Sequence, residues 1–279
     1  MTTSDPKRTG YDERFLGLPD PVPLPVSPAG SARVVLDYTH FSVVLDTDRR
    51  LAAATAVNID GDRVLDVPRS DDWHLDDRVP AGAQAGPELY ARNDLDRGHL
   101  VRRRDPVWGD PDVAARANSD TFAYTNAAPQ ANTFNQSKEL WLGLEDYILD
   151  AAVAFDRRLS VFTGVVFGAA DPLYRGVRIP LLFWKVAAWA QEGGLAATAY
   201  LLDQTPQLDR VDLGAVADAP PLGPFRTFQV PVEEIARLTA LDLGDLVAAD
   251  RLRVPVPAPS ARAGRAAWRE LDSPAALTL

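Results

Sequence analysis

Four adjacent residues, Asp96-Arg97-Gly98-His99, combine side chains that suit attack on a phosphodiester. A neutral histidine is the natural general base near pH 7, because its reference pKa is about 6.5. The planar guanidinium of an arginine can hold a phosphate through paired hydrogen bonds. The glycine lets a substrate or the backbone approach closely. The same residues also suit a solvated polar turn, so the motif alone leaves both interpretations open.

The surroundings of this motif are positively charged, although the chain is acidic. Residues 92–104 hold five arginines and two aspartates, a local charge of +3 (5 − 2), whereas the 279-residue chain has a net charge of −10. A local sign that opposes the global one indicates a placed group of charges. The global sign argues against a protein that coats nucleic acid, but it allows an enzyme that touches a few phosphates.

A second polar stretch, residues 125–145, is rich in side-chain carboxamides: Asn126, Gln130, Asn132, Asn135 and Gln136. Asn and Gln favour turns and helix caps, so one interpretation is a loop followed by a capped helix. A carboxamide oxygen is also a hard ligand for Mg²⁺, an ion that often keeps most of its waters and takes one or two protein oxygens.

With these blocks in order, the sequence resembles the DNA/RNA non-specific endonucleases, the ββα-metal (His-Me finger) nucleases that include endonuclease G. The family's D-R-G-H stands at Asp96–His99. Its T/S-N-x-x-P-Q and the following L/F-N-Q match TNAAPQANTFNQ, with nine positions from Asn126 to Asn135 (135 − 126). The family's tryptophan, and the glutamate four residues after it, match Trp141 and Glu145. The resemblance runs from YDERFLG to about residue 250.

The resemblance implies a role for each matched residue. His99 would be the general base that activates water. Asn135 would be the one direct protein ligand of a Mg²⁺ ion, for which Mn²⁺ is an alternative. Arg97 would contact phosphate and steady the charge of the transition state.

Other matched positions would support the site. Asn126 would help to orient it, and Glu145 would hold metal-bound water. Asp96 is expected to be structural, bonding to the backbone or to Arg97 near a turn. Gly98 is also expected to give structural support.

Some positions match the family loosely or depart from it. Arg102 is a further candidate for binding substrate phosphates. A second family arginine, upstream of the motif, is matched loosely by Arg69, with Arg78 as a rival. The family often has an arginine one helical turn after the glutamate, where this chain has Leu149. These departures affect the expected rate and substrate preference more than the type of reaction.

Several predicted elements must position these residues. β-rich runs at 38–45 and 51–60 predict a hairpin, residues 158–168 a buried strand, and residues 179–204 a second hairpin that turns at 192–194. Apolar residues at helical spacing predict an amphipathic helix over 136–154, and a strand before Pro231 precedes another helix. Hairpins interleaved with helices indicate an α+β fold, a mostly antiparallel central sheet flanked by helices. The resemblance adds a ββα-metal motif.

We expect a single nuclease domain over residues 1–279. Within it, the proline-rich residues 1–33 would form an extended arm and residues 255–279 a loosely packed tail. Residues 61–93 predict a long irregular segment. No run approaches about 18 apolar residues, and the N-terminus lacks the apolar core of a signal peptide. We therefore expect no membrane span, and a cytoplasmic location or export by a non-classical route.

The composition excludes several other chemistries. The chain has no cysteine, which rules out disulfides, thiol nucleophiles and cysteine-based metal sites. Its three histidines, His40, His74 and His99, have no zinc-motif spacing. Sequence motifs of serine hydrolases, dinucleotide-binding folds, P-loop proteins and zinc proteases are absent.

The sequence therefore predicts a Mg²⁺-dependent endonuclease acting on DNA and RNA with little sequence preference. The family pattern implies 5′-phosphate and 3′-hydroxyl ends. Activity should rise as pH passes the imidazole pKa, because only the neutral ring accepts a proton. The first alternative is a non-catalytic nucleic-acid-binding protein on the same fold. The second alternative is a protein-interaction module, and the third is an enzyme that acts on another phosphodiester.

The choice between DNA and RNA, the oligomeric state and the biological role stay open at this level. A cell that keeps such an enzyme in its cytoplasm would be expected to hold an inhibitor protein.

Overall fold

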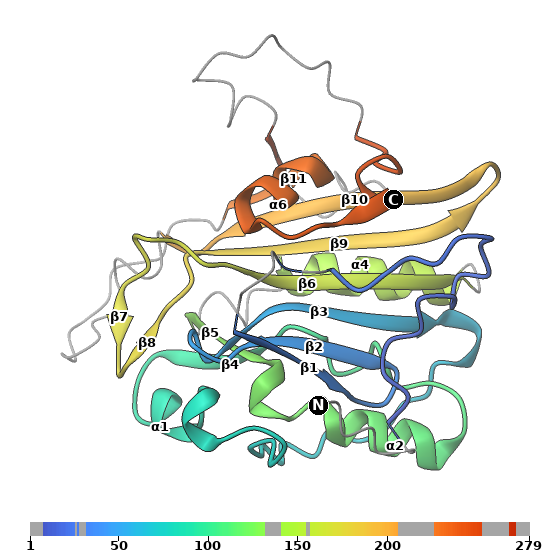
Figure 1. Ribbon diagram of the computed structural model, residues 1–279. Helices are drawn as coiled ribbons and strands as arrows, with labels where there is room; N and C mark the ends of the chain where they lie inside the picture. Colours follow the sequence, from blue (N-terminus) through green and yellow to red (C-terminus); the bar gives the residue numbers. More distant parts are fainter. Residues whose placement is uncertain are drawn as a thin grey trace, which may run out of the picture.

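The computed structural model describes residues 8–25, 27, 32–131, 141–154, 157–205, 226–252 and 268–271. A large antiparallel sheet runs through its centre, in the strand order β1-β2-β3-β6-β9-β10-β11-β12 (Figure 1). Its strands are β1 (Arg33–Asp37), β2 (Phe41–Asp46), β3 (Leu51–Asp60), β6 (Arg158–Val166), β9 (Leu182–Gln191), β10 (Gly194–Asp203), β11 (Arg226–Val230) and β12 (Arg269–Glu270).

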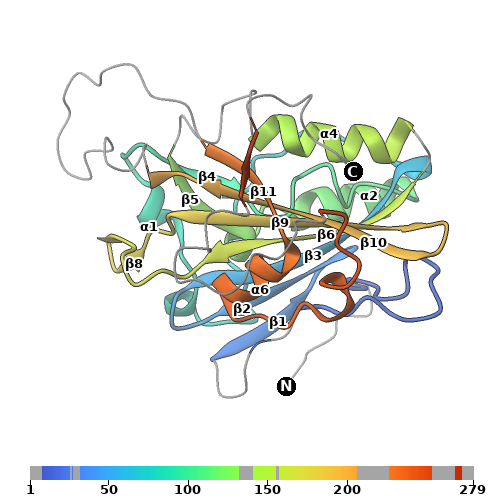
Figure 2. The ribbon, with the colours of Figure 1, turned by 90° about the horizontal axis from the view of Figure 1, so that it is seen from above.

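Both faces of this sheet are covered, because successive side chains along each strand point to opposite sides. Val43 and Leu45 of β2 enter one core, whereas Val44 between them enters the other. Figure 2 shows the two layers: α2 (Pro111–Asp120), α4 (Trp141–Ala154), β4 (Leu95–His99) and β5 (Ala127–Ala131) on one side, and α6 (Val232–Thr239) on the other. The molecule therefore has a helix–sheet–helix arrangement.

Short elements connect these layers. Residues 61–93 hold only 3-10 turns and one short helix, as their composition predicts. The short elements are η1 (Gly61–Arg63), η2 (Ala81–Ala83), α1 (Pro87–Tyr90), η3 (Tyr124–Asn126), β7 (Leu173–Tyr174), β8 (Val177–Arg178) and η4 (Gly244–Leu246).

The predicted α+β class is confirmed, with its large antiparallel sheet and flanking helices. The two predicted hairpins are β2–β3 and β9–β10, and the predicted buried strand is β6, which pairs with β3 and β9. β11 precedes α6, whose first residue follows Pro231. The predicted helix over 136–154 is described from Trp141 onward, and residues 136–140 lie outside the described residues.

The N-terminal segment contacts the face opposite α4, and β12 extends the edge of the sheet. Phe15, Leu16 and Val22 from the N-terminal segment pack into the core beneath α6. At the other end, β12 pairs with β11, while most of residues 255–279 lie outside the described residues. The expectation of a single domain stays a prediction. Within the described ranges, no helix is long and apolar enough to cross a membrane.

The D-R-G-H motif lies in a strand, which differs from the polar turn considered for it. β4 pairs with β5 antiparallel, so that Arg97 faces Pro129 and His99 faces Ala127. The composition of β5, AAPQA, gives little strand signal, and its proline cannot donate to a ladder. Pro129 is tolerated because this sheet has only two strands and therefore only edges.

Candidate active site

A cavity of about 810 Å³ opens over the β4–β5 pair. Its lining residues come from β4, from residues 69–93, from the arginine cluster after β4, from η3 and from α4. Side chains alternate along β4, so Arg97 and His99 share one face of this strand. The small sheet thus holds both residues rigidly at the centre of the cavity.

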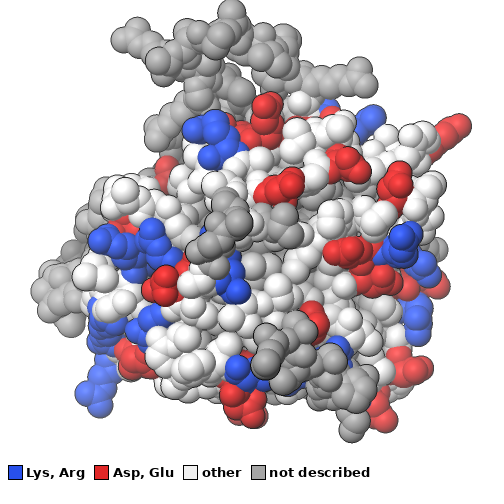
Figure 3. Space-filling view, viewed as in Figure 1, with Lys and Arg blue, Asp and Glu red and all other residues white. Residues whose placement is uncertain are grey.

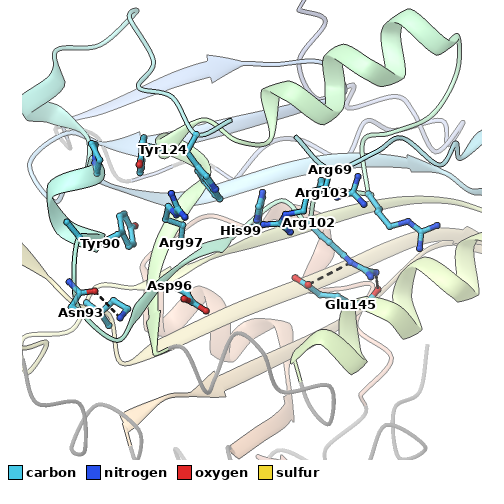
Figure 4. A pocket seen from close by; sticks show the side chains of 15 residues that line it. Arg69, Tyr90, Asn93, Asp96, Arg97, His99, Arg102, Arg103, Tyr124 and Glu145 are labelled. Atoms are coloured by element: carbon cyan, nitrogen blue, oxygen red, sulfur yellow. Dashed lines mark hydrogen bonds and ion pairs between the residues drawn. The ribbon is translucent and has the colours of Figure 1, made fainter. Parts of the chain in front are cut away.

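The cavity has two chemically different ends, with Arg97 and His99 between them (Figure 4). We call one the arginine end, formed by Arg69, Arg102, Arg103 and Arg104 together with Glu145. We call the other the tyrosine end, formed by Pro87, Tyr90, Ala91, Asn93, Leu95 and Tyr124. The predicted residues Asp96, Arg97, His99, Arg102, Arg69 and Glu145 therefore meet in one cavity.

Aromatic rings shield the His99 imidazole from water. Its centroid lies 4.7 Å from the ring of Trp73 and 5.2 Å from that of Phe122. Its Nε2 is buried and has no hydrogen-bond partner within the described part of the chain. Burial, reinforced by repulsion from Arg69 and Arg103, lowers the pKa of His99 to about 3. The ring is therefore uncharged at neutral pH, and negative charge brought by a bound phosphate would raise its pKa and its ability to accept a proton.

The cavity carries a positive charge that the rest of the protein does not share. Five arginines and two carboxylates line it, a balance of +3 (5 − 2), against −10 for the whole chain. On the face shown in Figure 3, by contrast, acidic and basic side chains are interspersed. Arg97 lies with its Cζ 5.3 Å from the centroid of Trp73, and Arg69 with its Cζ 5.5 Å from that of Phe122. This concentration of guanidinium groups suits an anionic ligand such as a phosphate.

Beneath the arginine end lies a buried group of ion pairs. Glu145 is on the buried face of α4, and its Oε1 accepts a hydrogen bond from Lys185 Nζ at 3.4 Å. Arg102 donates to the Glu145 carbonyl at 2.9 Å, with its Nε 4.0 Å from Glu145 Oε2. Lys185 is 1% exposed, on the α4-facing side of β9 between Phe183 and the next core residue, Ala187. Two cations thus fix one carboxylate.

A second buried carboxyl group belongs to the same region. Burial raises the pKa of Asp105 to about 7, and the nearby positive charges of Arg102 and Lys185 oppose that rise. A buried carboxyl group with a raised pKa thus lies near the ion pairs of Glu145.

Asn126 has a supporting position. Its side chain is fully buried and does not line the cavity. Its Oδ1 accepts from the Val101 backbone at 2.8 Å, and its Nδ2 donates to the carbonyls of Val101 and Thr121 at 3.0 Å each. This carboxamide braces the chain directly after β4 and has no group left for substrate, and its orienting role stays a prediction.

Gly98 is required by its neighbour across the strands. A Cβ at this position would lie 2.0 Å from Gln130 Cδ, so any side chain would displace Gln130. The carboxamide of Gln130 is buried over the glycine, with no hydrogen-bond partner for its Nε2 or Oε1 inside the described ranges. The glycine of the motif therefore serves packing between β4 and β5, and Asp96 pairs with Gln130 in the register.

The two candidates for a second phosphate-binding arginine have different surroundings. Arg69 lines the cavity, and its Nε is 2.7 Å from Asp71 Oδ1 in an exposed ion pair. Arg78 lies outside the cavity lining, and its guanidinium is bound to Asp76 and donates to the Asp37 carbonyl. The geometry therefore favours Arg69.

One predicted residue cannot be located. Asn135, the expected metal ligand, lies outside the described residues. No group of three or more His, Cys, Asp or Glu side chains that could hold a metal occurs among the residues that are described. A Mg²⁺ site built on one carboxamide would not need such a group.

Several residues of the site were not predicted from the sequence. Lys185 could have been predicted, because a lysine inside the apolar run LFWKVAAWAQ indicates a buried side chain that needs an acidic partner. Trp73 and Phe122 gave none, since an aromatic residue in an irregular segment has no preferred neighbour. Leu149, at the position of the family's arginine, is buried in the core.

Comparisons with known proteins place the chain in a family. The sequence model described as DNA/RNA non-specific endonuclease matches residues 19–250. "Uncharacterized protein y4fB" of Sinorhizobium fredii (strain NBRC 101917 / NGR234) is 40% identical over 263 residues, which cover 85% of this chain and 39% of that protein. Mitochondrial endonuclease G is 30% identical over 183 residues in Bos taurus (61% of this chain, 54% of the relative) and over 195 in Homo sapiens (65% and 57%).

The chain therefore spans between 39% and 57% of the length of these relatives. A solved structure described as "Crystal structure of the EndoG/EndoGI complex: Mechanism of EndoG inhibition" has a similar fold, with a TM-score of 0.56 and 18% identity. The similarity covers 75% of this chain and 84% of that one.

The burial of His99 predicts a pH dependence of stability. Below pH 6.5 the unfolded chain binds a proton on this histidine, whereas the folded protein does not until about pH 3. Stability from this group is therefore present above pH 6.5 and is lost as pH falls. Between pH 7.5 and 5, the free energy of unfolding should fall by about 2 kcal/mol more in the wild type than in His99→Gln. Urea denaturation at both pH values measures this, and equal losses would contradict it.

The pair of Lys185 and Glu145 predicts a second stability effect. Lys185→Met should lower the free energy of unfolding at pH 7 by about 3 kcal/mol, because it leaves a buried carboxylate short of a cation. Glu145→Gln added to this variant should recover most of the loss. Arg237→Met is the control, since Arg237 is 59% exposed in its pair with Glu234 and should cost under about 1 kcal/mol. A loss as small as that of the control would contradict a buried pair.

Proposed function

Because the chain belongs to the DNA/RNA non-specific endonuclease family, we propose that it hydrolyses phosphodiester bonds in both DNA and RNA. The observation that carries this proposal is the uncharged, buried His99 at the centre of a cavity with five arginines. A binding protein has no use for a desolvated base among phosphate-binding groups. The reaction would leave 5′-phosphate and 3′-hydroxyl ends.

The described residues divide the chemistry between them. Arg97 and Arg69 would hold the non-bridging oxygens of the scissile phosphate and stabilise the charge that grows on them. His99 would take a proton from a water molecule as its oxygen bonds to phosphorus. The P–O3′ bond would then break, and the 3′-oxygen would receive a proton from solvent. These contacts involve no base edges, so sequence preference should be slight.

A metal ion fits the remaining groups. Asn135 would hold Mg²⁺ or Mn²⁺ directly, and the Glu145 carboxylate, which lines the cavity, would hold a water of the ion's hydration shell. When bound, the ion would neutralise charge on the phosphate and on the leaving oxygen. Because arginines outnumber carboxylates around the cavity, phosphate should strengthen binding of the cation.

We also infer that a cell retaining this enzyme in its cytoplasm needs an inhibitor protein. A solved structure with a similar fold is described as a complex of EndoG with EndoGI and as showing EndoG inhibition, which supports this inference. We likewise propose that the protein is cytoplasmic or exported by a non-classical route.

The central test is cleavage of supercoiled DNA and of RNA, measured side by side with Mg²⁺ and with EDTA. We expect both substrates to be cut only with metal present. His99→Ala should reduce turnover by roughly 10²–10⁴-fold, the usual contribution of a general base. A well-folded His99→Ala protein with near-wild-type turnover would remove this residue from the mechanism. Tight binding of DNA without any cleavage would favour the non-catalytic alternative.

A separate variant tests the metal ligand. Asn135→Ala should abolish metal-dependent cleavage while leaving the melting temperature near that of the wild type. If Asn135 only caps the helix that contains α4, the variant should instead lose roughly 0.5–2 kcal/mol of stability and still cut at saturating Mg²⁺. Asn132→Ala, a neighbouring carboxamide change, serves as the matched control for both measurements.

A further inference from the structure

The cavity extends well beyond the residues assigned to hydrolysis. Its volume of about 810 Å³ lies in the range of pockets that enclose a whole small molecule, and a single phosphate group needs much less. The tyrosine end accounts for this surplus. None of its six residues carries a charge, in contrast to the arginine end. In Figure 4, Tyr90 and Asn93 lie on one side of Arg97 and His99, and Arg102 and Arg103 on the other.

Tyr90 is the polar group at this end that lacks a partner. Its hydroxyl oxygen is buried, and no hydrogen-bond partner for it exists among the residues that the structure describes. Burying such a group unpaired costs free energy, so an unpaired hydroxyl beside a cavity indicates a bond formed with a ligand. Burial also raises the pKa of Tyr90, so the hydroxyl stays protonated and can donate.

A second polar side chain of this end, that of Asn93, is already committed. Asn93 donates from Nδ2 to the Leu89 carbonyl at 2.6 Å and to the Tyr174 hydroxyl at 3.3 Å. Its Oδ1 accepts from the Leu95 backbone at 3.0 Å. Asn93 therefore shapes the end of the cavity, and the Tyr90 hydroxyl is a donor there that no described residue satisfies.

A chain of packed rings connects Tyr90 to the phosphate-binding centre. The Tyr90 and Tyr124 rings stack at 6.0 Å with an interplanar angle of 24°, and Tyr124 lies 5.7 Å from Trp73. Arg97 in turn lies over Trp73, at 5.3 Å. A phosphate held by Arg97 would thus have an uncharged, aromatic wall on one side.

We propose that the tyrosine end is a subsite for the nucleoside next to the scissile phosphate, held by packing against Tyr90 and a hydrogen bond from its hydroxyl. This inference rests on the proposed hydrolysis of nucleic acid. Aromatic side chains bind bases of any identity, because every base has a flat π-face. Every nucleoside also offers acceptor atoms to a hydroxyl donor. The subsite should therefore recognise that a base is present, with little regard to which one.

The test uses oligonucleotides with one cleavable phosphodiester, all other linkages being methylphosphonates. The base on the 5′ or the 3′ side of that linkage is replaced by an abasic residue. We expect abasic replacement on one side to lower kcat/KM of the wild type roughly 5- to 150-fold, the range for one stacked base. In Tyr90→Ala the same replacement should change kcat/KM less than about twofold, because the contact is already lost.

Two further variants complete the experiment. Tyr11→Ala, a change of the same kind at a tyrosine that lies outside the cavity lining and packs into the core beneath α6, should keep the full abasic effect of the wild type. Tyr90→Phe keeps the ring and its packing, so it should show a reduced abasic effect even if Tyr90→Ala does not fold. An abasic effect of equal size in wild type and both Tyr90 variants, or none in the wild type on either side, would overturn the subsite. Failure of the wild type to cut the intact oligonucleotide would instead refute the proposed function.

Discussion

A positive charge on His99 cannot be accommodated without a large cost, and the site is arranged around that constraint. The imidazole packs against Trp73 and Phe122, and its Nε2 is shielded from water. Desolvation and the nearby arginines act in the same direction, and both keep the ring neutral. The arginines that repel a proton are also the groups that attract a phosphate. One arrangement thus keeps the ring unprotonated and attracts an anion, and the negative charge of a bound phosphate would raise the pKa of the ring and make it a stronger base.

The fold holds this arrangement through three side chains that do not themselves line the cavity, those of Asn126, Gln130 and Lys185. Asn126 ties the chain after β4 to the turn before β5, and Gln130 fits over Gly98 between the two strands. On the other wall, Lys185 from the central sheet fixes Glu145 of α4. The large sheet is therefore the common support, since β9 reaches the site through one buried lysine. A displaced sheet would move the carboxylate relative to the histidine.

Much of this could be predicted from local sequence. Alternating and helical patterns located the two hairpins, β6 and the later part of the helix, and the D-R-G-H residues met Glu145 and the arginines as expected. What failed depends on partners distant in sequence. β5 contains a proline and little β-branched character, and it becomes a strand because β4 is available beside it.

The pKa of His99 is a second property that could not be predicted from the sequence. An isolated histidine predicts a rise of activity near pH 6.5, whereas burial moves the pKa to about 3. The groups that cause this shift lie between 2 and 30 residues away in the chain. Spacing cannot place them around one ring. Similarly, nothing near Glu145 in the sequence indicates that Lys185, forty residues later, is its partner.

The measurement that tests the account most directly is the pH dependence of kcat/KM for nucleic-acid cleavage at saturating Mg²⁺, which reports protonation in the free enzyme. If His99 is a desolvated base among arginines, kcat/KM should stay level from pH 8 down to about pH 5, without a step near the ordinary imidazole pKa. A tenfold loss for each pH unit below about 6.5 would mean that the histidine titrates as a solvated one does, and would contradict the account.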